Sequence, residues 1–156
     1  MSLRTWVKDQ DQILASSGQV LYMYAPGTAT DVNRRRMVDA IESFASSSEG
    51  KFGFLMHLTQ HSKPPPASER KDLKEMFRRL GPRLSGVAVV VEADGFAGSV
   101  LRSAVTMLFV TNRGGFPAKV FAHPAEAAAW LSARQQLKAA ALETLVREGQ
   151  EEFRAA

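Results

Sequence analysis

Two short runs of nearly uninterrupted apolar residues, 52–58 and 86–91, constrain the fold more than any other feature of this 156-residue chain. Strands with one wet face alternate apolar and polar residues, whereas runs of this kind indicate strands that are covered on both faces by helices. Helical patterns follow both runs, and strands that alternate with helices form mostly parallel sheets with right-handed crossovers. The sequence therefore predicts an α/β fold with a central, mostly parallel sheet.

Local patterns supply the other elements of the predicted sheet. Residues 5–8 and 20–24 predict an opening hairpin, because turn residues 16–18 separate these two β-type segments. A short strand is expected at 118–121, which brings the sheet to about five strands. Apolar residues at helical spacing predict a helix after each strand from the second onward. We expect one domain over residues 1–134.

Residues 135–156 predict an added C-terminal helix. Its apolar side chains cover about half of the helical wheel, and they are Leu137, Ala141, Leu142, Leu145, Val146 and Phe153. Gly149 is expected to weaken this helix by about 1 kcal/mol relative to alanine. Part of so broad an arc would stay exposed in a monomer, which predicts a homodimer formed through this helix. The alternative is a helix folded wholly back on its own sheet.

The amino-acid composition indicates the cellular compartment in which the chain works. The chain has no cysteine, so disulfides and thiolate-bound metals are excluded, and a reducing compartment fits. Charged residues precede any apolar run at the N-terminus, which indicates no signal peptide. No stretch reaches the roughly 18 apolar residues of a membrane helix. We expect a cytoplasmic protein without an integral membrane span.

The net charge of +4 comes from one region. Residues 63–83 hold seven Lys or Arg and three acidic residues, an excess of four. Lys71, Lys74 and Arg78 fall on one face of the predicted second helix, and they form either a binding surface or a solvated face. Phe77 belongs to the core stripe of that helix and is not free to stack on a base, so nucleic acid is not an expected partner.

The sequence carries no recognisable catalytic or cofactor-binding motif. No Gly-x-Ser-x-Gly, Gly-x-Gly-x-x-Gly or P-loop pattern follows a predicted strand. His57 and His61 lie on a strand and its loop, on the order of 12 Å apart, so a metal site is not expected and His57 is interpreted as a satisfied strand-end histidine. Glu92 and Asp94 are interpreted as solvated turn carboxylates. We therefore predict neither an enzyme nor a cofactor.

Polar residues follow the second and third strands, where the loops open on the carboxyl edge of a parallel sheet. Ligands gather at that edge. The candidate binding residues in these loops and the helix starts beside them are Thr28, Thr30, Arg34, Ser62 and Ser68. Arg34 lies near the core side of the first helical turn, so its guanidinium serves either a ligand or nearby backbone carbonyls.

Several local patterns together resemble one known family. They are residues 27–30 before an Arg-rich helix, Ser68-Glu69-Arg70, Arg102-Ser103 with Thr106, and residues 119–121 leading to Glu126-Ala127 and Trp130-Leu131. As a set over residues 5–133, they resemble the STAS domain (sulphate transporter and anti-sigma-factor antagonist), in particular its SpoIIAA-like, Sec14-like bacterial members.

The resemblance implies a protein-binding regulatory module without catalytic residues. Anti-sigma-factor antagonists carry a phosphorylated serine in an Asp-Ser loop, whereas residues 57–66 of this chain contain no acidic residue. Ser62 and Ser68 remain phosphorylation candidates by position. Some relatives hold apolar ligands between sheet and helices, so the alternative function is a small apolar-ligand or lipid carrier with a pocket near Met56, Phe96, Val105 and Phe109.

Overall fold

Six strands form one sheet in the computed structural model, which describes residues 2–110 and 115–155 and, at Val110, only the backbone. Their order across the sheet follows their order in the sequence. The strands are β1 (Arg4–Lys8), β2 (Ile13–Ser17), β3 (Val20–Ala25), β4 (Phe52–Thr59), β5 (Leu84–Glu92) and β6 (Ala118–Phe121). The expected α/β domain with a mostly parallel sheet is confirmed.

The predicted count of about five strands was one short. The missed strand β2 pairs antiparallel with both β1 and β3. Of the turn predicted at residues 16–18, Gly18 lies in the turn with a φ of 58°, whereas Ser16 and Ser17 belong to β2. The predicted hairpin of residues 5–8 with 20–24 is wrong, because β2 lies between these two strands. The Ile-Leu-Ala-Ser-Ser segment of β2 gave no signal, since it shows neither alternation nor a run of β-branched residues. From β3 onward, all neighbouring strands are parallel.

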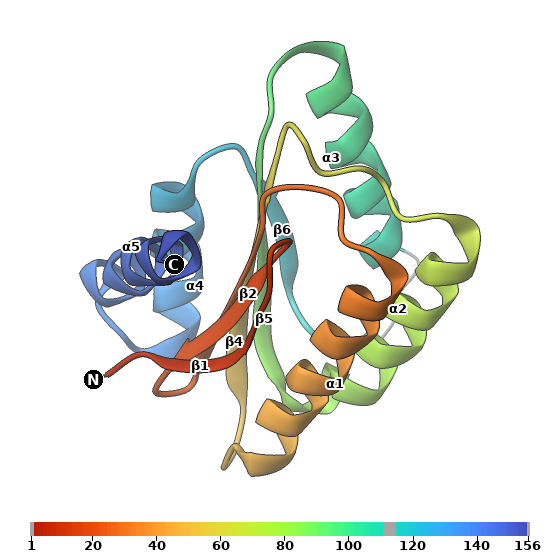
Figure 1. The fold of residues 1–156 in the computed structure, drawn as a ribbon. Coiled ribbons are helices and arrows are strands. Elements are labelled where there is room, and N and C mark those ends of the chain that lie inside the picture. Colours follow the sequence, from red (N-terminus) through yellow and green to blue (C-terminus); the bar gives the residue numbers. More distant parts are fainter. Residues whose placement is uncertain (1, 111–114, 156) are drawn as a thin grey trace.

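Within the described ranges, five α-helices flank the sheet. They are α1 (Asp31–Ser47), α2 (Ala67–Leu80), α3 (Gly95–Val110), α4 (Pro124–Gln135) and α5 (Ala139–Arg154), with a short 3-10 turn at Gly81–Arg83. Each of the first three connects parallel neighbours, and each connection steps in the same direction across the sheet. Since such crossovers have one hand, α1, α2 and α3 all cover the same face (Figure 1). Among the described residues, no helix has the length and apolar character needed to cross a membrane.

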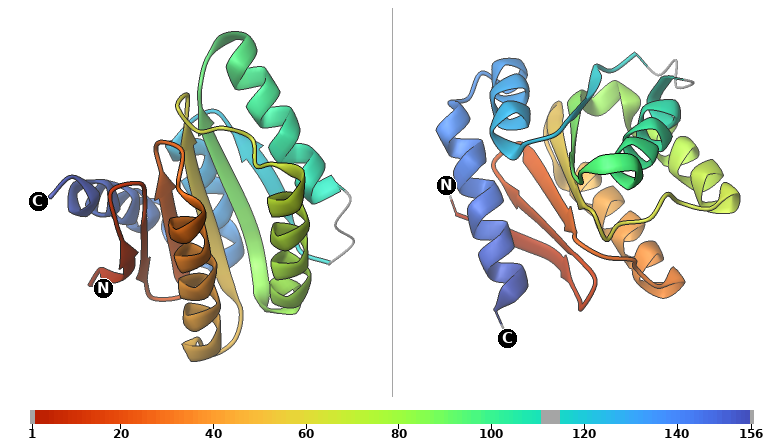
Figure 2. Two further views of the ribbon diagram at one scale, coloured as in Figure 1. Left: turned by 45° about the vertical axis from the view of Figure 1, so that its right-hand side comes forward. Right: turned by 90° about the horizontal axis from the view of Figure 1, so that it is seen from above.

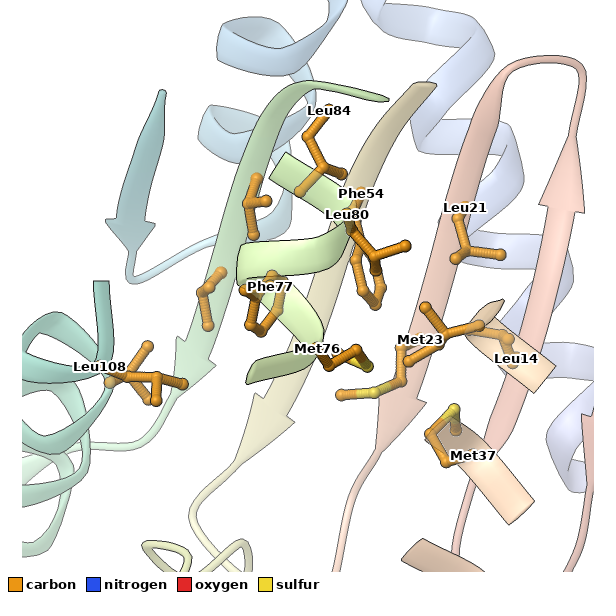
Figure 3. Packing of buried hydrophobic residues seen from close by; sticks show 14 of the residues in the cluster. Leu14, Leu21, Met23, Met37, Phe54, Met76, Phe77, Leu80, Leu84 and Leu108 are labelled. Carbon is orange, nitrogen blue, oxygen red and sulfur yellow. The ribbon is translucent and has the colours of Figure 1, made fainter. Parts of the chain in front are cut away.

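The three-helix face of the sheet, covered by α1, α2 and α3, has an apolar core. Phe54 of β4 meets Met76, Phe77 and Leu80 of α2, and Leu84 lies beside them (Figure 3). The ring of Phe77 lies 6.3 Å from that of Phe54 and 5.0 Å from that of Phe109, measured between centroids. Phe77, which was predicted to belong to the core stripe of this helix, is therefore buried.

The two-helix face, on the other side of the sheet, is divided between α4 and α5. α4 lies over β4 and β5, and α5 lies across β2 and β3 (Figures 1 and 2). α4 approaches closely where Gly53 and Gly86 pair across β4 and β5. A Cβ atom on Gly86 would lie 3.0 Å from Arg134, and one on Gly53 would lie 3.1 Å from Leu131.

α5 packs against its own sheet, while Leu137, Ala141 and Phe153 of the predicted apolar arc stay partly exposed. Leu142, Leu145 and Val146 are buried in the core of the two-helix face. The one-directional crossovers explain this packing, because they leave β2 and β3 without a helix on the second face. The predicted boundary between residues 134 and 135 falls at the end of α4, and the homodimer through α5 stays a prediction.

Candidate functional site

The carboxyl edge of β3, β4 and β5 carries the loops in which the binding residues were predicted. In doubly wound sheets, ligands bind where the strand order reverses and adjacent loops diverge to opposite faces. Here the order does not reverse, so these loops all lead to helices on the three-helix face. They lie side by side at one end of the sheet (Figure 2).

Ser62 and Thr59 tie the β4–α2 loop to the β3–α1 loop. The Ser62 hydroxyl donates to the carbonyl oxygen of Ala25 over 2.8 Å and accepts from the amide of Thr59 over 3.1 Å. The Thr59 hydroxyl donates to the carbonyl oxygen of Pro26. Thr28 adds a longer bond of 3.4 Å to the carbonyl oxygen of His61. The structure therefore brings Thr28 and Ser62 together, in a structural role.

Arg34 serves the second of its two predicted roles, because its guanidinium is occupied within the chain. It donates to the carbonyl oxygen of Ala29 over 2.6 Å, to Asp31, and to Glu69 of α2 over 3.0 Å. Burial raises the pKa of Glu69 above its usual range; Arg34 lowers it and the nearby Asp72 raises it further. Arg34 thus fastens the start of α1 to the start of α2.

The two helix starts hold the remaining loop residues. Thr30 is the N-cap of α1, and its hydroxyl accepts from the amide of Asn33 over 3.2 Å. Ser68 is the second residue of α2 and is exposed, directly before the Glu69 that binds Arg34. Of the five loop residues predicted to bind, Ser68 is therefore the one whose side chain faces solvent without a hydrogen bond in the described structure.

The basic face of α2 is less basic than the sequence indicates. Arg78 makes two bonds to the carboxylate of Glu75, of 3.0 and 2.6 Å, and this hydrogen bonding lowers the pKa of the Glu75 carboxyl. Lys71 and Lys74 are exposed and have no ion pair within the described residues. Lys71 and Lys74 thus supply the accessible charge beside the exposed Ser68.

Phe96 is not part of the apolar pocket proposed for a carrier. Its side chain is 86% exposed at the start of α3, whereas Val105 is buried in the core. Phe109 packs against Phe77 and Phe116, with ring centroids 5.0 and 6.2 Å apart. The structure therefore fills the expected pocket with the chain's own side chains and leaves Phe96 outside it.

A buried polar chain on the two-helix face was missed by sequence analysis. His57 is 0% exposed; its Nδ1 lies 2.7 Å from the hydroxyl of Tyr22, and its Nε2 bonds to Glu92. Glu92 is therefore more than the solvated turn carboxylate expected, although its side chain is 43% exposed. The available signal was position, since all three residues belong to neighbouring strands and point to the same face.

Burial sets the protonation preferences of this polar chain. It lowers the pKa of His57 below its usual 6.5, although Glu92 opposes the shift. It raises the pKa of Tyr22 well above 10.0, and the charges of Tyr24 and Glu92 add to that effect. Within the described parts of the chain, no three His, Asp or Glu side chains gather to hold a metal ion.

Comparison with known proteins adds no relative. No protein-family model, curated protein or solved structure matches the chain.

Proposed function

We propose that this chain is a noncatalytic regulatory module of the STAS type, which binds a protein partner at the carboxyl edge of its sheet. One observation carries the proposal: the polar groups of that edge are already used to fasten its loops together. Ser62, Thr59 and Arg34 direct their hydrogen bonds to backbone oxygens or to acidic side chains of the chain itself. Such groups build a preformed surface, whereas catalysis needs them available to a substrate.

The proposed partner presents acidic side chains to Lys71 and Lys74 of this chain. Lys71 and Lys74 are exposed on α2, the helix that follows one of the fastened loops, and have no ion pairs among the described residues. Complementary charge gives an interface its register and association rate. Lys51 and Lys138, which are equally exposed, lie away from the carboxyl edge and provide a matched control.

Affinity purification with three forms of the protein tests this surface. The partner should be retained by the wild type and by the control K51E/K138E, and lost from K71E/K74E. Retention should also weaken as salt is raised, because exposed charges are screened within a Debye length of about 8–10 Å. Identical sets of retained proteins from all three forms would contradict the proposal.

Phosphorylation of Ser68 is the proposed control of binding. A phosphate there lies in the first turn of α2, where backbone amides and the helix dipole favour a negative charge. It also adds about two negative charges beside Lys71 and so weakens contact with an acidic partner. Ser62 is the poorer acceptor, because its hydroxyl is engaged in two hydrogen bonds.

Two measurements test this control. Mass spectrometry of protein purified from its native cells should find phosphate on Ser68 and not on Ser62. The substitution Ser68→Glu should weaken partner binding, whereas Ser68→Ala should leave it unchanged. Equal binding by both variants would remove Ser68 from the proposed mechanism.

A further inference from the structure

One arrangement of hydrogens gives every member of the polar chain on the two-helix face a partner. An ionised carboxylate is only an acceptor, so His57 Nε2 carries the hydrogen that it shares with Glu92. Nδ1 then has a free lone pair, and Tyr22 donates its hydroxyl hydrogen to it over 2.7 Å. His57 is therefore neutral while this arrangement holds, and all three side chains have partners.

The groups around His57 oppose a second proton more than they favour it. From β5, Glu92 favours a positive ring, while burial disfavours it more strongly. From β3, Tyr22 contributes its hydroxyl and Tyr24 lies with its ring centroid 5.0 Å away. From α5, the positive charge of Arg154 reaches Tyr22. The buried residues that α4 adds to this cluster are uncharged.

A second proton would break the hydrogen-bond pattern. With a hydrogen on Nδ1, the ring becomes a donor on both sides, and the Tyr22 oxygen must accept instead of donate. The hydroxyl hydrogen of Tyr22 then needs another acceptor, and the described residues provide no second bond to it. A buried donor without a partner destabilises the structure around it.

α5 is the element that covers Tyr22 and Tyr24 on the two-helix face. Its Gly149 lies against the Tyr22 ring so closely that a Cβ atom there would be 2.6 Å from the ring. Phe153 packs edge-on against Tyr24 with centroids 5.4 Å apart. At the end of α5, the side chain of Lys8 from β1 donates to the carbonyl oxygen of Ala155 and lies 3.6 Å from the carboxylate of Glu152. Separation of α5 therefore breaks no strand pairing.

We propose that His57 is the sensor of an acid-operated latch, in which its protonation releases helix α5 from β2 and β3. Release admits water to the Tyr22 hydroxyl and to the charged imidazole ring. Water can then accept the hydroxyl hydrogen that has no acceptor while α5 is docked. It also bares Tyr22, Tyr24 and the apolar side of α5, and exposed apolar surface of that kind marks interaction sites. The latch lies on the opposite face from the proposed partner surface and acts independently of it.

The direction of the pH effect follows from the two states. With α5 docked, burial holds the pKa of His57 below 6.5 although Glu92 opposes the shift; with α5 released, less burial acts against Glu92, so the pKa of His57 is higher. The released state therefore binds more protons, and its ratio to the docked state rises as pH falls below the released-state pKa. The rise is up to about tenfold per pH unit and ends below the docked-state pKa.

Hydrogen exchange of the full chain, followed by mass spectrometry from about pH 7.5 to about pH 5, tests the latch. After correction for the intrinsic pH dependence of exchange, the amides of α5 should lose protection in acid while those of β4 and β5 keep it. The variant His57→Gln is the matched control, because its amide can accept from Tyr22 and donate to Glu92 but does not titrate. Its α5 protection should not depend on pH.

Three results would overturn the proposal. The first is α5 protection in the wild type that stays constant down to about pH 5. The second is loss of protection in α5, β4 and β5 together, which would mean whole-chain unfolding. The third comes from Glu92→Gln, which keeps a hydrogen-bond acceptor but removes the charge that favours a protonated ring. In this variant, α5 should be released only at a lower pH than in the wild type. Release of α5 already at about pH 7.5 would instead make Glu92 the sensor.

Discussion

On the three-helix face, the sheet meets α2 through phenylalanine rings, whereas on the two-helix face glycines and a hydrogen-bonded polar chain lie among the apolar residues that meet α4 and α5. Phe54, Phe77 and Phe109 pack ring against ring on the first face. On the second, Gly149 lies against the Tyr22 ring, and the hydroxyl of that ring bonds to His57. One sheet thus supports two kinds of core.

The comparison indicates opposite sensitivities to mutation. Where large apolar rings fill the space, removal of volume leaves a cavity and loses dispersion contacts. Where backbones approach closely, added volume must push a helix away, and loss of a polar partner leaves a buried group unpaired. Four measurements test this difference between the two faces.

Phe77→Ala should have the largest effect, because it removes the ring at the centre of the three-helix face. We expect the free energy of unfolding to fall by about 3–5 kcal/mol, measured by urea denaturation. Phe96→Ala is the control, since that side chain is exposed, and it should change stability by no more than about 0.5 kcal/mol. Similar losses in both variants would mean that the cluster is not a packed core.

Gly149→Ala should destabilise the two-helix face although alanine favours helices by about 1 kcal/mol. The new methyl group would lie 2.6 Å from the Tyr22 ring, so the helix must shift, with a net loss of about 1–3 kcal/mol. Gly27→Ala is the matched control, because a Cβ there meets nothing within 4 Å. A Gly149→Ala protein more stable than the wild type would restore the view of Gly149 as a weak point of the helix.

Tyr22→Phe keeps the ring but removes the hydroxyl that donates to His57. The imidazole nitrogen loses its partner in a buried site, and the free energy of unfolding should fall by about 1–3 kcal/mol. Tyr24→Phe is the control on the same strand, since its hydroxyl makes no hydrogen bond within the described structure. Equal unfolding free energies for the two variants would show that the polar chain adds no stability.

Alkaline pH should give the smallest effect. Burial raises the pKa of Tyr22 above 10.0 in the folded chain, so the unfolded chain releases this proton first. The stability that depends on the protonated hydroxyl is complete below pH 10 and declines above it, by about 1.4 kcal/mol at roughly pH 11. Urea midpoints at pH 8 and pH 11 should therefore differ more for the wild type than for Tyr22→Phe.

Sequence patterns predicted the sheet's direction and most of its elements because these depend on local properties. The apolar runs at 52–58 and 86–91 became β4 and β5, and Phe77, predicted for the core stripe of the second helix, is buried on α2 with Met76 and Leu80. β2 was missed because full burial of a strand that contains Ser and Ala gives no alternating pattern.

The polar chain could not be predicted, because it depends on register. Tyr22 and His57 are 35 positions apart, as are His57 and Glu92. They meet only because β3, β4 and β5 are neighbours and Tyr24 pairs with His57 across the sheet. The loop residues were located correctly at the carboxyl edge, but whether Ser62 or Arg34 faces a ligand or a backbone oxygen depends on atomic distances that spacing does not give.

The division of the two-helix face has a consequence for biosynthesis. β2 and β3 are made early, but α5, the helix that covers Tyr22 and Tyr24, is made more than a hundred residues later. At roughly 5–20 residues per second, on the order of ten seconds pass between the two. During that interval the apolar residues of β2 and β3 that α5 later covers are exposed, which favours aggregation of the growing chain.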